Sequence, residues 1–264
     1  MILNYIHWNV KPEIFTIGDW GPRWYGMLFA LGFVFGYYIM LKFFKKEGIK
    51  QEVLDSLTIY MFIGTLVGAR LGHCFFYEPG FYLSHPVEIL KVWHGGLASH
   101  GGAIGILISL YFFSKKYKKS YLWIFDKIVI VTALAGAFIR TGNLMNSEIY
   151  GHATTLPWGF IFEQRGETVP KHPTQIYEAL SYLVIFIILY LIHEKTNLKK
   201  KQGFIFGLFL VLLFSARFFI EFVKENQVAF ENNMKLNMGQ MLSIPFIIVG
   251  ILLIFNALKN KAYK

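Results

Sequence analysis

Seven long apolar runs are the feature that most restricts what this chain can fold into. A helix needs about 20 mostly apolar residues to cross the hydrocarbon core of a bilayer. Only 16% of the 264 residues are charged, whereas about 25% is usual in a soluble domain. The sequence therefore predicts an all-α integral membrane protein, with one polytopic domain over residues 1–264 and seven transmembrane helices. The runs cover residues 24–43, 53–76, 96–114, 122–140, 175–193, 203–223 and 239–258.

The lysine residues alternate from loop to loop and so predict the orientation of the chain. Four lysines follow each of the first, third and fifth runs, and three end the chain. The remaining loops hold only one or two cations each. Because cationic loops stay in the cytoplasm, we expect an outside N-terminus and a cytoplasmic C-terminus, as in a bacterial inner membrane. The connection 141–174, which contains several glycines and prolines, is predicted to form a small cap on the outer side.

Three arginines lie within the apolar runs, namely Arg70, Arg140 and Arg217. An arginine at membrane depth is unfavourable by about 2.5–3.5 kcal/mol on insertion scales, so such residues are functional by default. All three lie toward the predicted outer ends of their helices, where they would suit a cavity that binds a phosphate group. Two structural alternatives remain open: Arg217 pairs with Glu221 at i+4, or an arginine extends to the membrane interface.

Further polar residues surround these arginines in the sequence. RTGNLMNSEIYG (140–151) places Asn143 one helical turn after Arg140 and Glu148 shortly after it. HPTQIYE (172–178) starts the next helix and carries Gln175 in its first turn. These residues are candidates for binding an anionic head group, with plain helix capping as the alternative for the second motif. Tyr25, in RWYGM, is by default a tyrosine of the membrane interface.

The stretch HGGLASHGG (94–102) places histidine and glycine at the start of a membrane helix. Backbone N–H groups at a helix start bind anions, and His100 would then act as a proton acceptor beside the anion. The alternative is that Gly101, Gly102 and Gly105 let two helices pack closely while His100 caps the helix. The residues alone favour neither interpretation.

No metal or cofactor is predicted. His94 and His100 are six residues apart, which is a weak metal signal, and a single cysteine, Cys74, allows no cysteine cluster. Cys74 is expected to pack in an apolar environment. Because the positive charges lie in alternate membrane loops, we expect membrane lipids rather than nucleic acid as partners.

Taken together, these motifs resemble the prolipoprotein diacylglyceryl transferase family over nearly the whole chain. Their order and spacing on seven predicted helices make the resemblance specific, whereas HGG alone would not. The resemblance rests on RWYGM at 23–27, GARLG at 68–72, WHGGLASHGGAIG at 93–105, RTGNLMNSEIYG at 140–151, HPTQIYE at 172–178, RFFIEF at 217–222 and MGQMLSIP at 238–245.

The resemblance implies an enzyme that moves a diacylglyceryl group from phosphatidylglycerol to a lipobox cysteine thiol in a preprolipoprotein signal peptide. Glycerol phosphate would be released and a thioether formed, with an active site toward the periplasmic side. The family's essential histidine matches His100, and its essential arginines match Arg140 and Arg217. Asn143, Glu148 and Gly151 match the family's signature, Glu221 matches its conserved acid, and Tyr25 matches a functional tyrosine. We expect these residues, together with Arg140, Arg70 and Gln175, to bind substrate.

The chain departs from the family pattern at three positions. Ile139 replaces a glycine before Arg140, Leu213 replaces a tyrosine four residues before Arg217, and Ser147 replaces the commoner glycine. This chain therefore lacks the hydroxyl group that such a tyrosine supplies.

Two other classes of protein fit part of the pattern. A transporter or scramblase for an anionic lipid or metabolite would also need buried arginines and glycine-rich helices, but many transporters show internal repeats and none is apparent here. A purely structural membrane protein leaves the convergent polar motifs unexplained.

Overall fold

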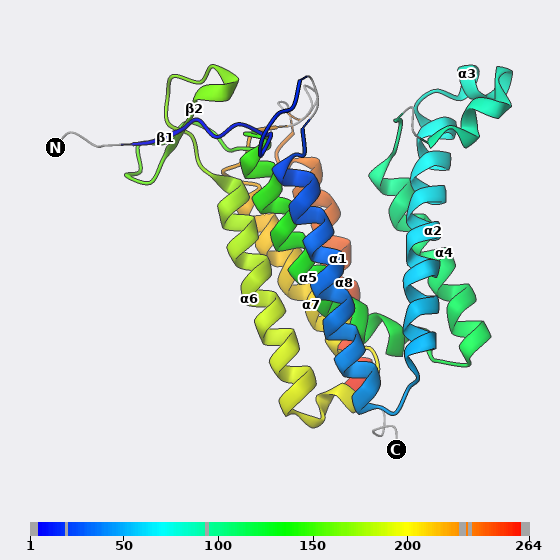
Figure 1. Cartoon of the computed structure of the whole chain (residues 1–264). Helices are drawn as coiled ribbons and strands as arrows, with labels where there is room; N and C mark the ends of the chain where they lie inside the picture. Colours follow the sequence, from blue (N-terminus) through cyan, green and yellow to red (C-terminus); the bar gives the residue numbers. More distant parts are fainter. Residues whose placement is uncertain (1–4, 19–20, 93–94, 227–230, 232–233, 260–264) are drawn as a thin grey trace. The chain divides into compact units, whose positions relative to one another are not determined.

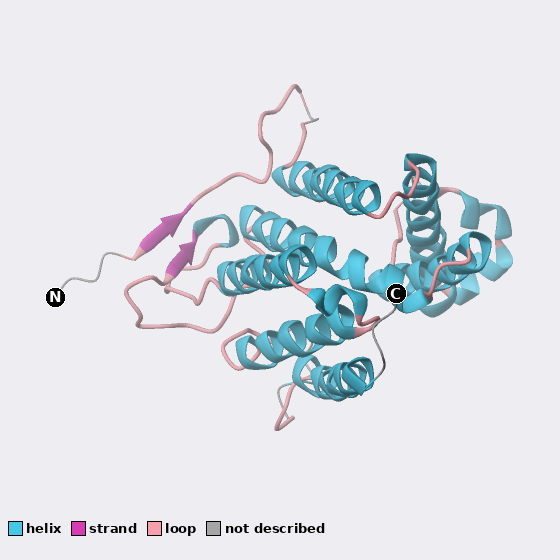
Figure 2. Cartoon of the chain, turned by 90° about the horizontal axis from the view of Figure 1, so that it is seen from below, coloured by secondary structure: helices cyan, strands magenta, loops and turns pink. Residues whose placement is uncertain are grey.

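The computed structural model describes residues 5–18, 21–92, 95–226, 231 and 234–259, and it is mainly helical in these ranges (Figures 1 and 2). Each predicted apolar run forms a long helix. Short helices, one pair of strands and connecting loops make up the rest of the described ranges. The long helices are α1 (Trp24–Lys46), α2 (Gln51–Phe76), α4 (Ser99–Tyr117), α5 (Tyr121–Met145), α6 (Thr174–Lys195), α7 (Phe204–Ile220) and α8 (Met238–Lys259).

Five of these helices, α1, α2, α5, α6 and α8, are long and apolar enough to cross a membrane. Helix α7 is shorter, with 17 residues, because the chain turns at Glu221. Helix α4 has 19 residues, but it begins with Ser-His-Gly-Gly and ends with Lys-Lys-Tyr. The chain is therefore a multi-pass helical protein with five candidate spans. The count of seven spans and the orientation of the termini stay predictions.

The chain divides into two compact units, residues 40–124 and residues 1–39 with 125–264. The prediction of one polytopic domain stays a prediction. Within the smaller unit, α2 packs on α4 with their backbones almost in contact. A Cβ atom at Gly68 would lie 2.3 Å from the carbonyl oxygen of Gly101, and one at Gly105 would lie 2.0 Å from that of Gly64. The interpretation of Gly101 and Gly105 as packing residues is thus confirmed. The accompanying expectation that His100 caps the helix is wrong, because the N-cap of α4 is Ala98 and no side chain caps it.

Not every glycine in this part of the chain packs so closely. A Cβ at Gly102 would meet its nearest neighbour at 3.6 Å, which is normal van der Waals contact. Cys74, on α2, is fully buried, as expected for a packing residue. Two short helices, α3 (Pro79–Ser84) and η1 (Pro86–Leu90), follow α2 in this unit.

In the larger unit α7 packs closely on α8. A Cβ at Gly207 would lie 2.7 Å from the carbonyl oxygen of Gly250, and a Cβ at Gly250 would lie 2.7 Å from the carbonyl oxygen of Gly207. The first turn of α7 is held by Asp126 of α5, whose carboxylate accepts N–H groups of Gly203 at 2.7 Å and Phe206 at 2.8 Å. A side chain from a neighbouring helix therefore satisfies N–H groups that a helix start leaves unpaired. The link between α6 and α7 contains the short helix η4 (Asn197–Lys200).

The predicted cap forms a small folded region, although α5 continues to Met145 and shortens it to residues 146–173. The N-terminal strand β1 (Ile6–Trp8) pairs in parallel with β2 (Phe160–Phe162), which is followed by η3 (Glu163–Arg165). Their side chains pack around a buried cluster that includes Leu144, and the indole of Trp8 donates to the Leu144 carbonyl at 3.0 Å. The cap is thereby attached to the end of α5.

Candidate active site

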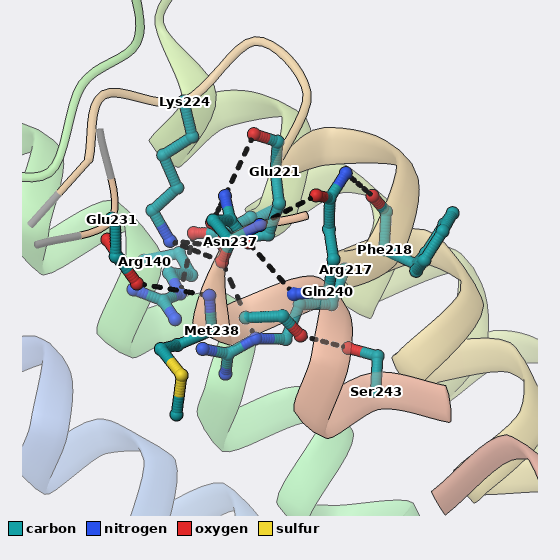
Figure 3. Close-up of polar contacts among 12 residues, drawn as sticks. Arg140, Arg217, Phe218, Glu221, Lys224, Glu231, Asn237, Met238, Gln240 and Ser243 are labelled. Carbon is teal, nitrogen blue, oxygen red and sulfur yellow. Dashed lines mark hydrogen bonds and ion pairs between the residues drawn. The ribbon is translucent and has the colours of Figure 1, made fainter. Parts of the chain in front are cut away.

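The ends of four helices in the larger unit bring charged side chains together. The C-termini of α5 and α7 and the N-termini of α6 and α8 meet at the end of the bundle that carries the cap (Figures 1 and 3). Each element contributes polar residues from a motif identified in the sequence. Successive helices run in opposite directions, so motifs distant in sequence meet here.

Arg140 lies in the last turns of α5 and binds a carboxylate of α6. Its Nε atom is 2.8 Å from Glu178 Oε2, and its Nη1 group donates to Asn143 Oδ1 at 3.3 Å. Glu178 is fully buried, whereas 17% of the Arg140 side chain is exposed. Asn143 in turn donates to Glu148 Oε1 at 2.8 Å. The predicted helical turn from Arg140 to Asn143 is therefore present, because α5 continues past Arg140.

The loop after α5 is shaped by Glu148. Its carboxylate also accepts from Asn146 at 3.2 Å, and its backbone carbonyl accepts from the amide of Gln175 at 2.7 Å. Gln175 is fully buried, so it joins the start of α6 to this loop. Ser147 and Ile149 adopt left-handed conformations, with φ of 51° and 62°. Ser147 thus occupies a conformation that favours glycine, the residue that is commoner there in the family.

Arg217 lies near the end of α7, and its Nε atom is 3.5 Å from Glu221 Oε1. The sequence alternative of an Arg217–Glu221 pair is confirmed, but 35% of the Arg217 side chain stays exposed. Glu221 also accepts from Asn237 Nδ2 at 3.2 Å. A Cβ at Gly239 would lie 2.5 Å from the Glu221 carboxyl carbon, so only glycine lets this carboxylate approach the start of α8. The N-terminus of a helix favours a negative charge at this place.

The start of α8 is a capping box. Asn237 Oδ1 accepts the N–H of Gln240 at 2.9 Å, and Gln240 Oε1 accepts the N–H of Asn237 at 3.1 Å. Glu231 accepts the N–H of Met238 at 3.1 Å. Since Asn237 also binds Glu221, the capping box positions the partner of Arg217 (Figure 3).

Lys224 is the site residue that sequence reasoning missed, whereas Glu178 ends the HPTQIYE motif that the sequence had singled out. Lys224 Nζ lies 3.2 Å from Glu178 Oε1 and 3.2 Å from Glu221 Oε1, and only 5% of its side chain is exposed. We call the continuous series Arg140–Glu178–Lys224–Glu221–Arg217 the ionic chain. In the sequence Lys224 counted only as a loop cation, although its spacing from Arg217 and Glu221, at i+7 and i+3, was a usable signal.

Tyr25 and Gly151 pack closely against the elements that carry the ionic chain. A Cβ at Gly142 would lie 2.8 Å from Cδ2 of Tyr25, so the half-buried ring of Tyr25 lies against the end of α5. Gly151 forms an isolated antiparallel bridge with Lys224. A Cβ at Gly151 would lie 2.1 Å from the carbonyl oxygen of Val223. Tyr25 thus contacts α5, the helix that carries Arg140, and Gly151 contacts the segment that carries Lys224.

His100 and Arg70 belong to the smaller unit. His100 is exposed in the first turn of α4, and it lines a cavity of about 360 Å³ together with Tyr77 and Phe76. The cavity adjoins an apolar groove of about 670 Å³ along α2 and α4, with Gly72, Phe76, Gly101 and Ile104 common to both. His94 lies outside the described residues.

Arg70 is buried and its guanidinium group binds backbone. It donates to the carbonyl oxygens of Glu88, Ile89, Gly95 and Gly96, and it lies 4.9 Å above the ring of Tyr82. Because these acceptors use its N–H groups, Arg70 holds the segment after α2 in place.

The cap has its own electrostatics. The Tyr150 hydroxyl donates to Glu167 at 2.7 Å, and burial together with this hydrogen bond raises the pKa of Tyr150 to about 12. Lys171 pairs with Glu225 at 2.6 Å and with Glu167 at 3.5 Å. Burial opposes the charge of Lys171, but the two carboxylates outweigh this effect and raise its pKa. These contacts hold the cap together, and Lys171 joins it to Glu225, the residue after Lys224.

The fold and the site define a multi-pass helical membrane protein. At one end of its larger unit, two arginines are each paired with a carboxylate, an arrangement that suits the binding of an anionic group. A family profile described as prolipoprotein diacylglyceryl transferase matches residues 12–256. The chain belongs to this family, whose members are transferases.

Relatives of similar length support this assignment. A phosphatidylglycerol–prolipoprotein diacylglyceryl transferase of Tolumonas auensis is 48% identical, with 97% of this chain and 99% of the relative covered. The protein of the same name from Chloroherpeton thalassium is 47% identical, with 97% and 96% covered. That from Bacteroides fragilis is 44% identical, with 100% and 99% covered. Family membership therefore extends over the whole chain.

Proposed function

We propose that this chain transfers the diacylglyceryl group of phosphatidylglycerol to the lipobox cysteine thiol of a preprolipoprotein. The reaction agrees with the name of its full-length relatives. The observation that carries the proposal for the site is the pair of partly exposed arginines, Arg140 and Arg217, each paired with a carboxylate of the larger unit. Guanidinium groups bind phosphate oxygens with two parallel hydrogen bonds, so this pair suits the phosphodiester of the lipid.

In the proposed step, a thiolate attacks the glyceryl carbon that is bound to the phosphate oxygen. The new S–C bond forms as the C–O bond breaks, and glycerol phosphate leaves with the bonding electron pair and a second negative charge. Arg140 and Arg217 stabilise this developing charge, which grows on the leaving phosphate. Asn143 holds Arg140 from the side, and Glu148 and Gln175 order the loop that carries Asn143. Tyr25 and Gly151 support the site by packing.

The thiol must first lose its proton, because the thiolate is the nucleophile and a free cysteine has a pKa of about 8.5. We assign this proton to His100, directly or through water. His100 is exposed at the mouth of its cavity, and the adjoining apolar groove suits the acyl chains of a lipid. If His100→Gln transfers at the wild-type rate from pH 6 to pH 9, another group accepts the proton.

The membrane arrangement belongs to the same proposal. Seven spans, an outside N-terminus and a cytoplasmic C-terminus would place the ionic chain at the outer leaflet of a bacterial inner membrane. The alternation of lysines between loops supports this orientation. Cysteine accessibility on the two sides of intact cells tests it. Labelling of a cysteine at exposed Lys235 only from the cytoplasm would contradict it.

The test of the activity uses purified protein, phosphatidylglycerol vesicles and a lipobox peptide. We expect a peptide that gains the diacylglyceryl mass through a thioether, with release of one glycerol phosphate for each peptide modified. Replacement of the peptide cysteine by serine is the control and should stop the reaction. Movement of lipid between leaflets without an adduct would instead support a transporter or scramblase.

A further inference from the structure

Lys224 occupies the centre of the ionic chain, although it lies just beyond the end of α7. Its ammonium group is equally distant, at 3.2 Å, from a carboxylate oxygen of Glu178 and from one of Glu221. Glu178 belongs to α6 and pairs with Arg140 of α5, whereas Glu221 pairs with Arg217 of α7. Lys224 is therefore the group that joins the two arginine–carboxylate pairs (Figure 3).

Because this bridge is buried, it is sensitive to the loss of any one of its charges. The side chains of Glu178, Lys224 and Glu221 are 0%, 5% and 8% exposed. Removing one partner of a buried charge pair leaves an uncompensated charge, which is strongly unfavourable. The two arginines are more exposed, at 17% and 35%, so they form the accessible ends of the chain while the lysine forms its interior.

The charges of the chain are unequal in number. Three cations, Arg140, Lys224 and Arg217, face two carboxylates, Glu178 and Glu221, so the directly paired side chains carry one positive charge in excess. Without Lys224 each arginine would have one carboxylate of its own and the excess would vanish. Lys224 thus shares the negative charge of both glutamates and leaves the guanidinium groups able to attract an anion.

The backbone of Lys224 is held by the cap. His152 donates its N–H to the Val223 carbonyl at 2.9 Å, and Glu225 donates to the Tyr150 carbonyl at 3.3 Å. These bonds enclose the bridge between Lys224 and Gly151. Because a Cβ at Gly151 would lie 2.1 Å from the Val223 oxygen, a larger residue there would push the segment that carries Lys224 away. Gly151 therefore acts on the site through the segment that carries Lys224.

We propose that Lys224 is a positioning residue of the transferase site, which holds Arg140 and Arg217 in register through Glu178 and Glu221 and preserves their excess positive charge. The inference rests on the proposed function. Lys224 itself does not contact the substrate in this proposal, because its ammonium group is buried and directed at the two carboxylates. Its effect is on the affinity for the lipid phosphate and on the stabilisation of the leaving group.

The experiment compares Lys224→Met with Lys224→Arg in the vesicle assay, and Lys235→Met is the matched control. Lys235 is exposed in the same connection between α7 and α8. We expect Lys224→Met to lower kcat/KM by about 10- to 100-fold, the range of a hydrogen bond to a charged group, with a raised KM for phosphatidylglycerol. Lys224→Arg should recover most of the activity, and Lys235→Met should match the wild type.

A double variant separates charge from structure. Lys224→Met with Glu178→Gln removes one charge of each sign and restores the excess of one positive charge, so it should have a lower KM than Lys224→Met alone. Wild-type kinetics in Lys224→Met would overturn the inference. The inference would also be overturned if the activity of Lys224→Met fell only in proportion to its folded fraction, with an unchanged KM. If wild-type protein itself forms no thioether, the proposed function fails, which is a separate result.

Discussion

Arg70 and Arg140 have the same sequence signal, an arginine inside an apolar run, but the structure gives them opposite surroundings. Arg70 is buried against four backbone carbonyls in the smaller unit. Arg140 faces a carboxylate and an amide in the larger unit and keeps part of its surface exposed. The comparison teaches that the partners of an arginine in an apolar run decide its role. When backbone carbonyls accept its N–H groups, the arginine holds a segment in place. When it shares a carboxylate with another cation, N–H groups remain that can bind an anion.

The largest effect expected from this comparison is on activity. Arg140→Ala should lower thioether formation by about 10²–10³-fold, as removal of one donor to a developing oxyanion does. The fold should survive, because Glu178 keeps Lys224 as its partner. The rate is measured with the lipobox peptide, and the folded fraction by thermal unfolding in detergent. Transfer at the wild-type rate would remove Arg140 from the site.

Arg70 should show the reverse pattern. Arg70→Met should lower the free energy of unfolding by roughly 2–4 kcal/mol. Each of its four acceptors is only part-buried and so costs less than the about 1–3 kcal/mol of a fully buried acceptor left unpaired. The remaining folded protein should keep the wild-type KM for phosphatidylglycerol. Denaturant titration of the purified protein measures the first quantity and the vesicle assay the second. A raised KM with unchanged stability would place Arg70 at the substrate instead.

The glycine interface of α2 and α4 gives a smaller effect. Gly68→Ala should destabilise by about 1–3 kcal/mol, the range for overpacking, because its Cβ would lie 2.3 Å from the Gly101 carbonyl oxygen. Gly80→Ala is the control, since a Cβ there meets nothing within 4 Å. The two midpoints of unfolding are compared with that of the wild type. Equal midpoints would show that the backbones do not pack this closely.

The smallest effect is a gain in stability. Ser147 has φ of 51°, and the left-handed conformation costs a residue with a side chain roughly 1–2 kcal/mol. Ser147→Gly should therefore raise the free energy of unfolding, by less than this amount because glycine is more flexible in the unfolded chain. Thermal unfolding checks the direction. A lower melting temperature would mean that another contact of Ser147 outweighs the backbone term.

Sequence reasoning located the helices well and the partners poorly. Every apolar run became a helix, because the length and composition of a run act locally. The end of α5 was less predictable: residues 141–145 were expected in the cap, but they continue the helix and aim Asn143 at Arg140. Lys224 was missed because a lysine after a helix normally lies in solvent, whereas here it contacts α6, Glu221 and the cap and is buried.

The sequence by itself determined the membrane class, the positions of the helices, the polar motifs at their ends and, through those motifs, the family. Apolar length and charge along the chain are enough for this, since they need no knowledge of contacts. The tertiary structure decided which arginine meets carbonyls and which meets carboxylates, that Gly101 and Gly105 serve packing, and that Lys224 joins the two arginine pairs. The physical reason is that a buried charge takes its role from the groups within a few ångströms, and those groups come from helices far apart in the sequence.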